Sequence, residues 1–373
     1  MNAPLRDDLS SPLVAILYNA VGPDAGPDEK DVLQQVEAVA LALTDLGMRQ
    51  SRISCTLNLE TVRRRLETDR PDVVVNLVEA LGGSDRLMHV APALFDTLGI
   101  PYTGAPTDAI YTTGHKLLAK ARLKSGGLPT PAWLGSNQGE PAPEEGGCDA
   151  RLPGTFIVKT LYEHASFGID DDAVVEAAST AQLAEFLARR EQQLGRPCFA
   201  EEFIRGREFN LSVLAGADGP QVLPTAEIDF GEFPEGRPQI VGFNAKWEAE
   251  SAEYQKTPRR FLGCNEDRAL QDRLGELCRQ AWHLFGLRGY ARVDFRVDER
   301  GRPWILEVNA NPCLSPDAGF AAALNQAGIL FREAVARLLR DASHGAPARA
   351  GSAAESVPAA EAEQALALDR PGS

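Results

Sequence analysis

Two acidic residues, Asp294 and Glu307, lie in two neighbouring segments whose polar and apolar residues alternate, 292–297 and 304–309. Such alternation is typical of half-buried strands, and we interpret the two segments as a β-hairpin. A register that gives the hairpin one uniformly apolar face determines which residues lie opposite each other. This register pairs Val297 with Trp304, Phe295 with Leu306 and Val293 with Val308.

The same register places Asp294 opposite Glu307, and Arg292 beside Asn309. Two carboxylates directly across a sheet repel each other unless a cation lies between them. Together with the amide oxygen of Asn309 they form a set of hard oxygen ligands, which suits Mg²⁺ that shares its shell with substrate phosphates. The hairpin therefore predicts a nucleotide enzyme. The alternative is an exposed hairpin edge with scattered charges, because alternation is also ordinary in half-buried strands.

The composition of the whole chain limits what such a site can serve. At 373 residues the chain is too long for one small core, and it predicts two or three domains or subdomains. A hydrophobic content of 44% and a charged content of 24% describe an ordinary globular protein. The net charge of −15 argues against nucleic acid or an anionic membrane as the main partner, since both require clustered basic residues. Any phosphate-binding site must therefore be local.

No segment predicts a membrane span or a secretion signal. The longest apolar runs, such as 13–18 and 71–78, are far shorter than the ~20 residues that a membrane span requires. The first residues carry acids and no apolar core. The 6 cysteines have neither the paired spacing nor the companion histidines of a zinc site. We expect a cytoplasmic protein with reduced thiols.

The N-terminal part predicts alternating strands and helices, which is typical of a parallel sheet covered by helices. We expect strands at 13–18 and 71–78, a helix at 28–46 and a further segment at 87–98. No glycine-rich dinucleotide motif follows the first strand.

The rest of the chain predicts two blocks of mixed structure. The expected elements of the first block are a helix at 116–124, a strand at 155–159, a helix at 181–194 and a strand at 198–203. The second block has a long loop at 229–261, a helix at 268–285, the hairpin and a terminal helix at 331–339. Residues 343–373 have almost no large apolar side chains, so we expect a disordered tail there.

Two further segments could serve a nucleotide. Lys159 ends a predicted strand, and the loop after it contains Ser166 and Gly168, which could offer a hydroxyl and backbone N–H groups to a polyphosphate. The acids Glu201 and Glu208 flank a predicted strand and a glycine turn, where backbone groups could meet a base and a carboxylate could accept from ribose hydroxyls. Taken alone, each segment also has an ordinary interpretation. The first could be a surface lysine beside a turn, and the second a solvated acidic edge strand.

In their order along the chain, these motifs resemble the ATP-grasp superfamily and, within it, the D-alanine–D-alanine ligase-like branch. The resemblance spans residues 12–342, and the last motif is the most specific. The matching motifs are Tyr102-Thr-Gly104 before Lys116, Val158-Lys159 with the loop 163–168, Glu201-Glu-Phe-Ile-x-Gly-x-Glu208, Arg292-Val-Asp294, and Leu306-Glu-Val-Asn-x-Asn-Pro312.

The resemblance implies an α/β (α+β) architecture, the ATP-grasp fold. Residues 12–110 would form an N-terminal parallel α/β subdomain, and 111–200 and 201–342 would form two α+β subdomains that clamp ATP. The tail at 343–373 would follow them. The family also implies a homodimer.

The resemblance further implies a role for each matching residue. Two Mg²⁺ ions, for which Mn²⁺ could substitute, would be held by Asp294, Glu307 and Asn309. The oxyanion would be stabilised by Arg292. Nucleotide phosphates would meet Lys116, Lys159, Ser166 and Lys246, adenine would meet Glu201, Glu202 and Ile204, and ribose would meet Glu208.

The substrate half departs from the family pattern. Where D-alanine–D-alanine ligases carry a serine that orients the first substrate, this chain has Ala165, the lid tyrosine is replaced by Trp247, and Cys313 stands for a glycine. We therefore expect an ATP-dependent carboxylate–amine ligase that forms an acyl phosphate and joins amino-acid-like substrates. Strict D-alanine–D-alanine ligation, or ATP binding without ligase activity, remains the alternative.

Three substrate-side residues are candidates with open roles. Ser315 matches the region that binds the acceptor carboxylate in the family. His164 lies inside the phosphate loop and could contact a substrate carboxylate or transfer a proton, or it could be a packed loop residue. For Cys313 we favour a structural substitution over a nucleophile, because its backbone N–H matches the family's role.

Overall fold

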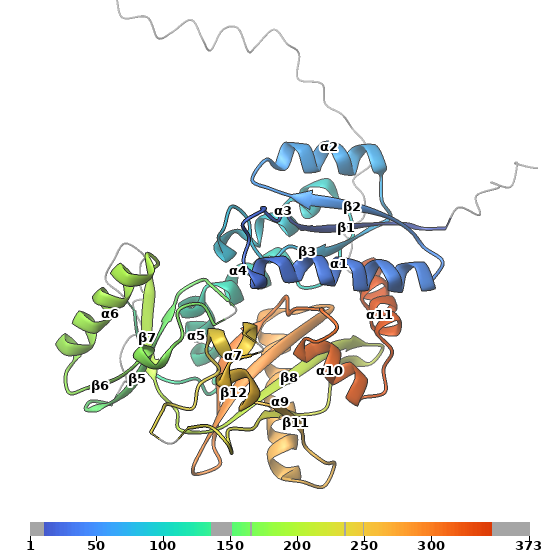
Figure 1. Cartoon of the computed structure of the whole chain (residues 1–373). Coiled ribbons are helices and arrows are strands. Elements are labelled where there is room, and N and C mark those ends of the chain that lie inside the picture. The colour runs from blue at the N-terminus through green and yellow to red at the C-terminus, as the bar shows by residue number, and fades with distance from the viewer. Residues whose placement is uncertain (1–10, 136–150, 165, 235, 249, 345–373) are drawn as a thin grey trace, which may run out of the picture.

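The computed structural model describes residues 11–344 apart from 136–150, 165, 235 and 249. Its strands form three separate sheets with helices packed on them, so the architecture is α/β as expected (Figure 1). Ala165 and the tail from 345 onward lie outside the described residues.

The N-terminal sheet is parallel, with the strand order β2–β1–β3. The predictions at 13–18, 28–46 and 71–78 correspond to β1, α1 and β3. The sequence does not predict β2 and α2, because β2 is a partly exposed edge strand and α2 buries only Val62 and Leu66. The elements are β1 (Leu13–Asn19), α1 (Pro27–Asp45), β2 (Arg49–Cys55), α2 (Leu59–Asp69), β3 (Val73–Leu77), the short helix η1 (Asp85–Leu87) and α3 (Val90–Leu98).

A second sheet of 4 antiparallel strands has the order β4–β7–β5–β6. Helix α6 covers one face of this sheet and packs on Phe156, Val158 and Ala200. Helices α4 and α5 connect this part of the chain to the N-terminal sheet. The elements are α4 (Thr107–Gly114), α5 (Lys116–Ser125), β4 (Trp133–Gly135), β5 (Gly154–Thr160), η2 (Asp171–Ala173), β6 (Val174–Ala177), α6 (Thr180–Leu194) and β7 (Cys198–Glu202).

The third sheet has 6 strands in the order β11–β10–β8–β12–β13, with β9 paired to β8. Helix α9 packs against one face, where Phe209, Val293 and Phe295 are fully buried. The predicted loop at 229–261 contains α7, α8 and β11. The elements are β8 (Gly206–Gly216), β9 (Gly219–Val222), β10 (Ala226–Ile228), α7 (Phe243–Trp247), α8 (Ala252–Gln255), β11 (Arg259–Phe261), α9 (Arg268–Phe285), β12 (Tyr290–Asp298) and β13 (Pro303–Asn309).

The hairpin β12–β13 has the predicted register in one half and a different one in the other. Asp294 pairs with Glu307, as expected, but a β-bulge follows. Phe295 therefore pairs with Ile305 instead of Leu306, and Ile305 is the fully buried residue. The prediction for the outer half was wrong because a bulge inserts one residue into one strand, which alternation alone does not reveal. Beyond the bulge, Arg296 pairs with Trp304 and Val297 with Pro303.

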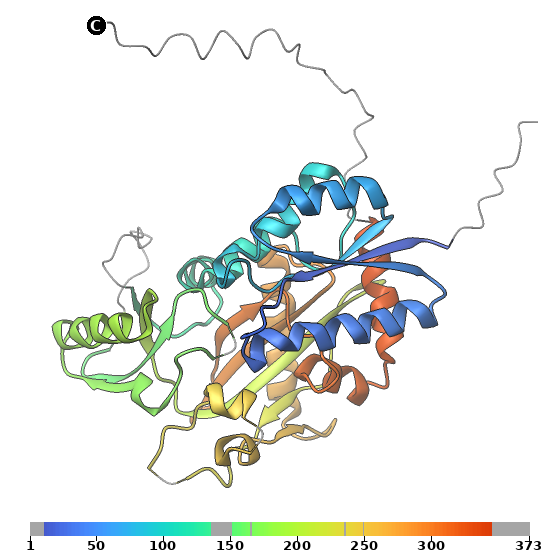
Figure 2. The same cartoon turned by 45° about the horizontal axis from the view of Figure 1, so that its top comes forward.

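Two C-terminal helices, α10 (Gly319–Gln326) and α11 (Phe331–His344), complete the core of the N-terminal sheet. Figures 1 and 2 show α11 beside α1, and Leu338 and Leu339 are buried with Val36 and Leu43. Helix α11 runs past the predicted end at 339 and past the expected start of the tail at 343. The C-terminal helices thus bury their apolar faces against both α1 and the third sheet, where Leu214 and Tyr290 belong to the same core.

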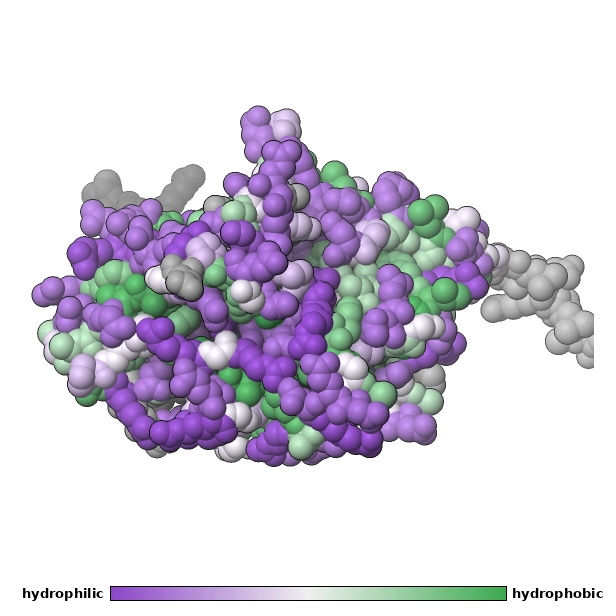
Figure 3. All heavy atoms as spheres, turned by 60° about the horizontal axis from the view of Figure 1, so that its bottom comes forward, coloured by the Kyte–Doolittle hydropathy of each residue, from purple (hydrophilic) through white to green (hydrophobic). Residues whose placement is uncertain are grey.

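The face of the molecule in Figure 3 is mostly hydrophilic, with separate small apolar areas. Within the part of the chain that the structure describes, no helix is long and apolar enough to span a membrane.

Candidate active site

Strands β12 and β13 bring two carboxylates and an amide to one face of the third sheet. Residues directly paired across antiparallel strands point to the same side, so Asp294 and Glu307 share a face, and so do Arg292 and Asn309. The Arg292 guanidinium donates two hydrogen bonds of 2.8 Å to the two carboxylate oxygens of Asp294. Burial lowers the pKa of Arg292 and Asp294 raises it, with a net upward shift. In this state a cation therefore offsets the charge of Asp294.

Glu307 is surrounded by nitrogen groups from three other segments of the chain. His164 Nδ1 lies 2.9 Å from Glu307 Oε1, and the charges of Lys116 and Lys246 also act on this carboxylate. Burial raises the pKa of Glu307, but His164 and the two lysines outweigh burial and hold it well below its usual range. Glu307 is therefore a carboxylate in the folded protein throughout the neutral range.

His164 is connected on two sides. Its backbone N–H donates to Asp85 Oδ2 at 2.7 Å, and its ring reaches Glu307, while its buried Nε2 has no hydrogen-bond partner. The ring is thus fixed by a site carboxylate and still offers one ring nitrogen. Neither interpretation of His164, as a packed loop residue or as a substrate contact, describes this geometry by itself.

A buried ion-pair network links the predicted phosphate lysine to a third lysine. Glu201 accepts from Lys159 Nζ at 2.5 Å and from Lys120 Nζ at 2.6 Å, and only 1% of its side chain is exposed. The predicted adenine contact through this carboxylate does not describe its present role, which is to compensate two ammonium groups. The sequence analysis missed Lys120, although it lies four residues after Lys116 and thus on the same face of the predicted helix.

Lys116 lies at the start of α5 and donates to the backbone oxygen of Glu163 at 2.6 Å. Burial lowers the pKa of Lys116, and Glu307 and Asp85 oppose that shift. The lysine therefore joins the loop at 163–168 to the carboxylate of the hairpin.

Glu208, the predicted ribose residue, is paired with an arginine that the sequence analysis did not single out. Arg296 Nη2 lies 2.9 Å from Glu208 Oε2, and only 4% of the Arg296 side chain is exposed. Arg296 also donates to the backbone oxygens of Gly206 and Gln239, and its guanidinium stacks over Phe230 at 5.2 Å. This arginine ties the β7–β8 linker to the segment after β10. The sequence could have indicated Arg296, because it lies two residues after Asp294 and therefore on the same face of the strand.

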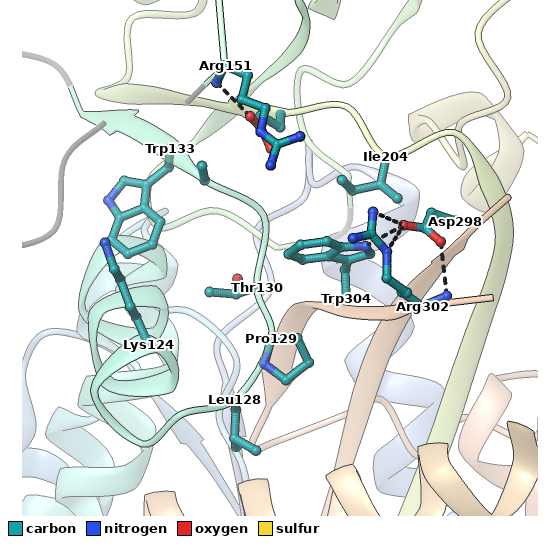
Figure 4. Close-up of a pocket in the computed structure, with 12 residues that line it drawn as sticks. Lys124, Leu128, Pro129, Thr130, Trp133, Arg151, Ile204, Asp298, Arg302 and Trp304 are labelled. Atoms are coloured by element: carbon teal, nitrogen blue, oxygen red, sulfur yellow. Dashed lines mark hydrogen bonds and ion pairs between the residues drawn. The ribbon is translucent and has the colours of Figure 1, made fainter. Parts of the chain in front are cut away.

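A cavity of about 370 Å³ lies beside the linker (Figure 4). Two of the residues predicted to meet adenine, Glu202 and Ile204, line it, and two tryptophans form opposite sides. Glu202 accepts from the backbone N–H of Arg151 at 2.8 Å. The tryptophans are Trp133 and Trp304, and the remaining lining includes Lys124, Leu128, Pro129, Thr130, Ala132, Asp298 and Arg302.

The remaining predicted phosphate contacts lie around the lid at 229–261. Ser166 has a positive φ of 61°, and its hydroxyl donates to the backbone oxygen of Val241 at 2.8 Å. Lys246 lies on α7 with an exposed side chain, near Arg292, Asp294 and Glu307. Desolvation and the charge of Arg292 lower the pKa of Lys246. Trp247 is the last residue of α7.

On the substrate side, Asp31 of α1 accepts hydrogen bonds from three side chains, the first of which is Gln35, whose Nε2 donates to Asp31 Oδ2 at 3.3 Å. Ser315 Oγ donates to Asp31 Oδ1 at 2.7 Å, and Cys313 Sγ donates to Asp31 Oδ2 at 2.8 Å. Ser315 is completely buried, so this geometry does not support its predicted contact with substrate. Burial, Glu79 and Asp31 raise the pKa of the Cys313 thiol, which fits the structural interpretation of that residue.

Glu79 lies next to this cluster, and the sequence analysis missed it. Gln35 Nε2 donates to Glu79 Oε1 at 3.0 Å. Burial, with Asp31 and Asp85, raises the pKa of Glu79 to about 7, and Gln35 and His164 oppose the shift. No motif marks this acid in the sequence, because its partners come from α1, η1 and the phosphate loop.

Comparison with known proteins identifies the family. The family model for the D-ala D-ala ligase C-terminus matches residues 123–340. Over 309 residues the chain is 31% identical to a D-alanine–D-alanine ligase of Synechococcus sp. (strain JA-3-3Ab), which covers 82% of this chain and 87% of that protein. The chain belongs to the D-alanine–D-alanine ligase family. A second ligase so named, from Pseudomonas entomophila (strain L48), is 30% identical and covers 88% of this chain and 92% of its own length.

Not every protein similar to this chain has a name that states an activity. A relative from Sinorhizobium fredii (strain NBRC 101917 / NGR234), 30% identical over 73% of this chain and 74% of its own, is named an uncharacterized protein.

The fold agrees with the family. The crystal structure of D-alanine–D-alanine ligase from Bacillus anthracis complexed with ATP superimposes with a TM-score of 0.67 and covers 90% of this chain and 98% of that chain. At 18% sequence identity this likeness shows the fold alone, and it confirms the expected ATP-grasp fold.

Proposed function

We propose that this protein is an ATP-dependent ligase that joins a carboxylic acid to an amine, with amino-acid-like substrates. The observation that carries the proposal is the pairing of Asp294 with Glu307 and of Arg292 with Asn309 on one face of the third sheet. Lysines from α5, β5 and α7 stand around that face. Membership in a family whose named members are ligases supports the same activity.

The donor atoms at the hairpin fit magnesium. Two carboxylates and one amide oxygen are hard ligands. In this structure Asp294 accepts from the Arg292 guanidinium, and Glu307 lies within hydrogen-bond distance of the His164 ring. We assign Asp294, Glu307 and Asn309 to two Mg²⁺ ions, with Mn²⁺ as a substitute. Bound Mg²⁺ would neutralise charge on the phosphates of ATP.

The protein's own groups would act on ATP and on the acid. Lys116, Lys159 and Lys246 would offset the charge of the phosphates. We assign the base to the pocket beside Glu202 and Ile204, and the ribose to Glu208, which Arg296 must then release or share. Ser166 would exchange its bond to Val241 for a phosphate oxygen.

The reaction would proceed in two displacements. A carboxylate oxygen of the acid attacks the γ-phosphorus, that O–P bond forms, and the bond to ADP breaks with its electron pair going to ADP. The amine nitrogen then attacks the acyl carbon, the C–N bond forms, and phosphate leaves with the carboxylate oxygen, while the amine loses a proton. After the C–N bond forms and before phosphate leaves, the acyl oxygen carries a negative charge. Arg292 and the backbone N–H of Cys313 would stabilise this oxyanion.

Strict D-alanine–D-alanine ligation is the second candidate, because similar proteins carry that name. The substitutions at Ala165, Trp247 and Cys313 argue for another acid. Adding D-alanine as the sole amino acid separates the two, because the strict ligase would then release phosphate from ATP. A protein that binds ATP without ligating would release none with any pair.

We further propose a cytoplasmic homodimer. Both assignments follow from the resemblance to the family.

The test of the proposed function is a screen of amino acids, singly and in pairs, for ATP-dependent phosphate release, followed by mass spectrometry of the products. The proposal expects equal amounts of ADP, phosphate and a new amide from at least one pair. Tight ATP binding with no phosphate release from any pair would contradict it.

A further inference from the structure

One buried carboxylate on β7 is shared by two lysines from different elements. Lys120 of α5 donates to Glu201 Oε2 at 2.6 Å, and Lys159 of β5 donates to Glu201 Oε1 at 2.5 Å. The side chains of Glu201 and Lys120 are 1% and 2% exposed, whereas the side chain of Lys159 is 15% exposed. Lys159 is therefore the partner that a ligand can reach.

Lys120 has two further contacts that hold it beside Glu201. Its Nζ donates to Thr130 Oγ1 at 2.9 Å and lies 5.4 Å from the centre of the Trp133 ring. Both residues line the cavity of Figure 4, and Trp133 is directly paired with Glu201 across β4 and β7. Lys120 would lose the contacts with Thr130 and Trp133 if it left Glu201.

The charges of the three groups do not balance. Burial raises the pKa of Glu201, but Lys120 and Lys159 outweigh burial, so the net shift is downward and the group is a carboxylate. Burial lowers the pKa of Lys120, and the charge and hydrogen bond of Glu201 oppose that shift. Two ammonium groups thus face a single carboxylate. The excess positive charge is available to an anion at the more exposed lysine, Lys159.

We propose that Lys120 is a positioning residue that keeps Glu201 compensated when Lys159 turns from Glu201 to the phosphates of a nucleotide. The inference rests on the proposed use of ATP and on the assignment of Lys159 to its phosphates. A buried carboxylate that loses its cation is strongly destabilised. Because Lys120 stays in place, Glu201 keeps one cation while Lys159 changes its partner.

Removal of Lys120 should therefore weaken ATP binding. Glu201 and Lys159 would then form an exclusive pair, and ATP could take Lys159 only by leaving a buried carboxylate without a cation. We expect Lys120→Met to raise the Kd for ATP about 10–100-fold.

Removal of the carboxylate as well should restore binding. In the double variant Lys120→Met/Glu201→Gln, no carboxylate at position 201 competes with the phosphates for Lys159. We expect its Kd for ATP to return to within about 3-fold of the wild-type value. Any loss of packing near Thr130 and Trp133 is common to both variants, so recovery in the double variant separates the charge effect from a structural one.

The test measures the Kd for ATP with Mg²⁺ by titration calorimetry in wild type and in each variant, and chemical denaturation shows whether each variant is folded. Arg122→Met is the matched control. It removes a cation from the same helix, but Arg122 donates to the backbone oxygen of Leu284 and stacks over Phe285 on α9. It should keep the wild-type Kd.

The inference fails by itself if Lys120→Met binds ATP as tightly as wild type, or if the double variant binds no better than the single one. If Lys120→Met does not fold, the double variant is compared directly with wild type. A loss of more than about 10-fold in its ATP affinity then overturns the inference. A wild type that does not bind ATP contradicts the proposed function, and the inference with it.

Discussion

At the scale of single residues, each site carboxylate has its own nitrogen partner. Asp294 is held by Arg292, Glu307 by His164, and Glu201 by Lys120 and Lys159. Removing one member leaves its partner uncompensated, and the cost depends on how deeply the pair is buried. Two carboxylates at different depths should therefore respond differently to the same substitution.

Glu307→Gln should reduce ligase turnover by roughly 10²-fold or more while the fold persists, since the change removes a charge from the phosphate side of the site. Steady-state phosphate release measures the turnover, and circular dichroism measures the fold. Glu299→Gln, an exposed acid on the turn of the same hairpin, is the control and should retain turnover. A fully active Glu307→Gln protein would remove the metal assignment.

Glu201→Gln should destabilise the whole protein by about 3–5 kcal/mol, because it leaves the buried Lys120 without its carboxylate. Chemical denaturation measures the free energy of unfolding. Glu202→Gln, the next residue on β7, has a partly exposed side chain and should cost less than about 1 kcal/mol. Equal losses for the two variants would show that the lysine network does not stabilise the fold.

Glu79 should make stability depend on pH. In the folded protein it keeps its proton up to pH about 7, whereas the unfolded chain loses it near the ordinary value of 4.5. The folded state therefore binds more protons between these values, and stability falls as pH rises through that window. Glu79→Gln should remove this fall, so the variant gains about 1–2 kcal/mol relative to wild type between pH 5 and 8. Parallel stability curves for the two proteins would refute the assignment.

Sequence predicted the residues whose types reveal chemistry and missed those that act through neighbours. Asp294, Glu307 and Asn309 were visible because a strand register brings them together. Asp31 and Glu79 were not visible, because their contacts depend on how α1 packs against the segments after β13 and β3. Such contacts arise from tertiary packing, which no local pattern encodes.

At the scale of elements, strongly periodic segments were predicted well and marginal ones were not. Helix α9 has the predicted bounds, and β1, β3, β5 and α6 differ by a few residues at most. The strand β2 and the charged helix α2 lack a clear apolar pattern, and the bulge after Asp294 shifted the outer half of the hairpin. Periodicity thus locates elements but does not count inserted residues.

Arg296 connects three elements, so its removal should loosen the lid. Arg296→Met should increase hydrogen exchange across 229–242, because the bonds to Gln239 and Glu208 are lost. The same variant should change the KM for ATP about 10-fold or more, since Glu208 is freed. Arg300→Met, at an exposed position of the hairpin turn, is the control. Unchanged exchange in the lid would contradict the role of Arg296 as a tie.

At the scale of the whole molecule, the ligase site lies where three parts of the chain meet. The hairpin comes from the third sheet, the lysines from α5 and β5, and the acids Asp31 and Glu79 from the N-terminal part. The C-terminal helices pack on α1 and so hold the N-terminal part against the third sheet (Figure 2). The candidate nucleotide-binding residues can be predicted from sequence motifs. The substrate-side residues come together only through this packing, so the structure was needed to find them.

The central claim is that a carboxylate oxygen of the acid is transferred to phosphate. The direct measurement uses an acid from the substrate screen labelled with ¹⁸O in its carboxylate, with unlabelled ATP and the amine, and mass spectrometry of the phosphate released. The acyl-phosphate route predicts one ¹⁸O atom in each phosphate and one retained in the amide. Unlabelled phosphate released together with amide would contradict it.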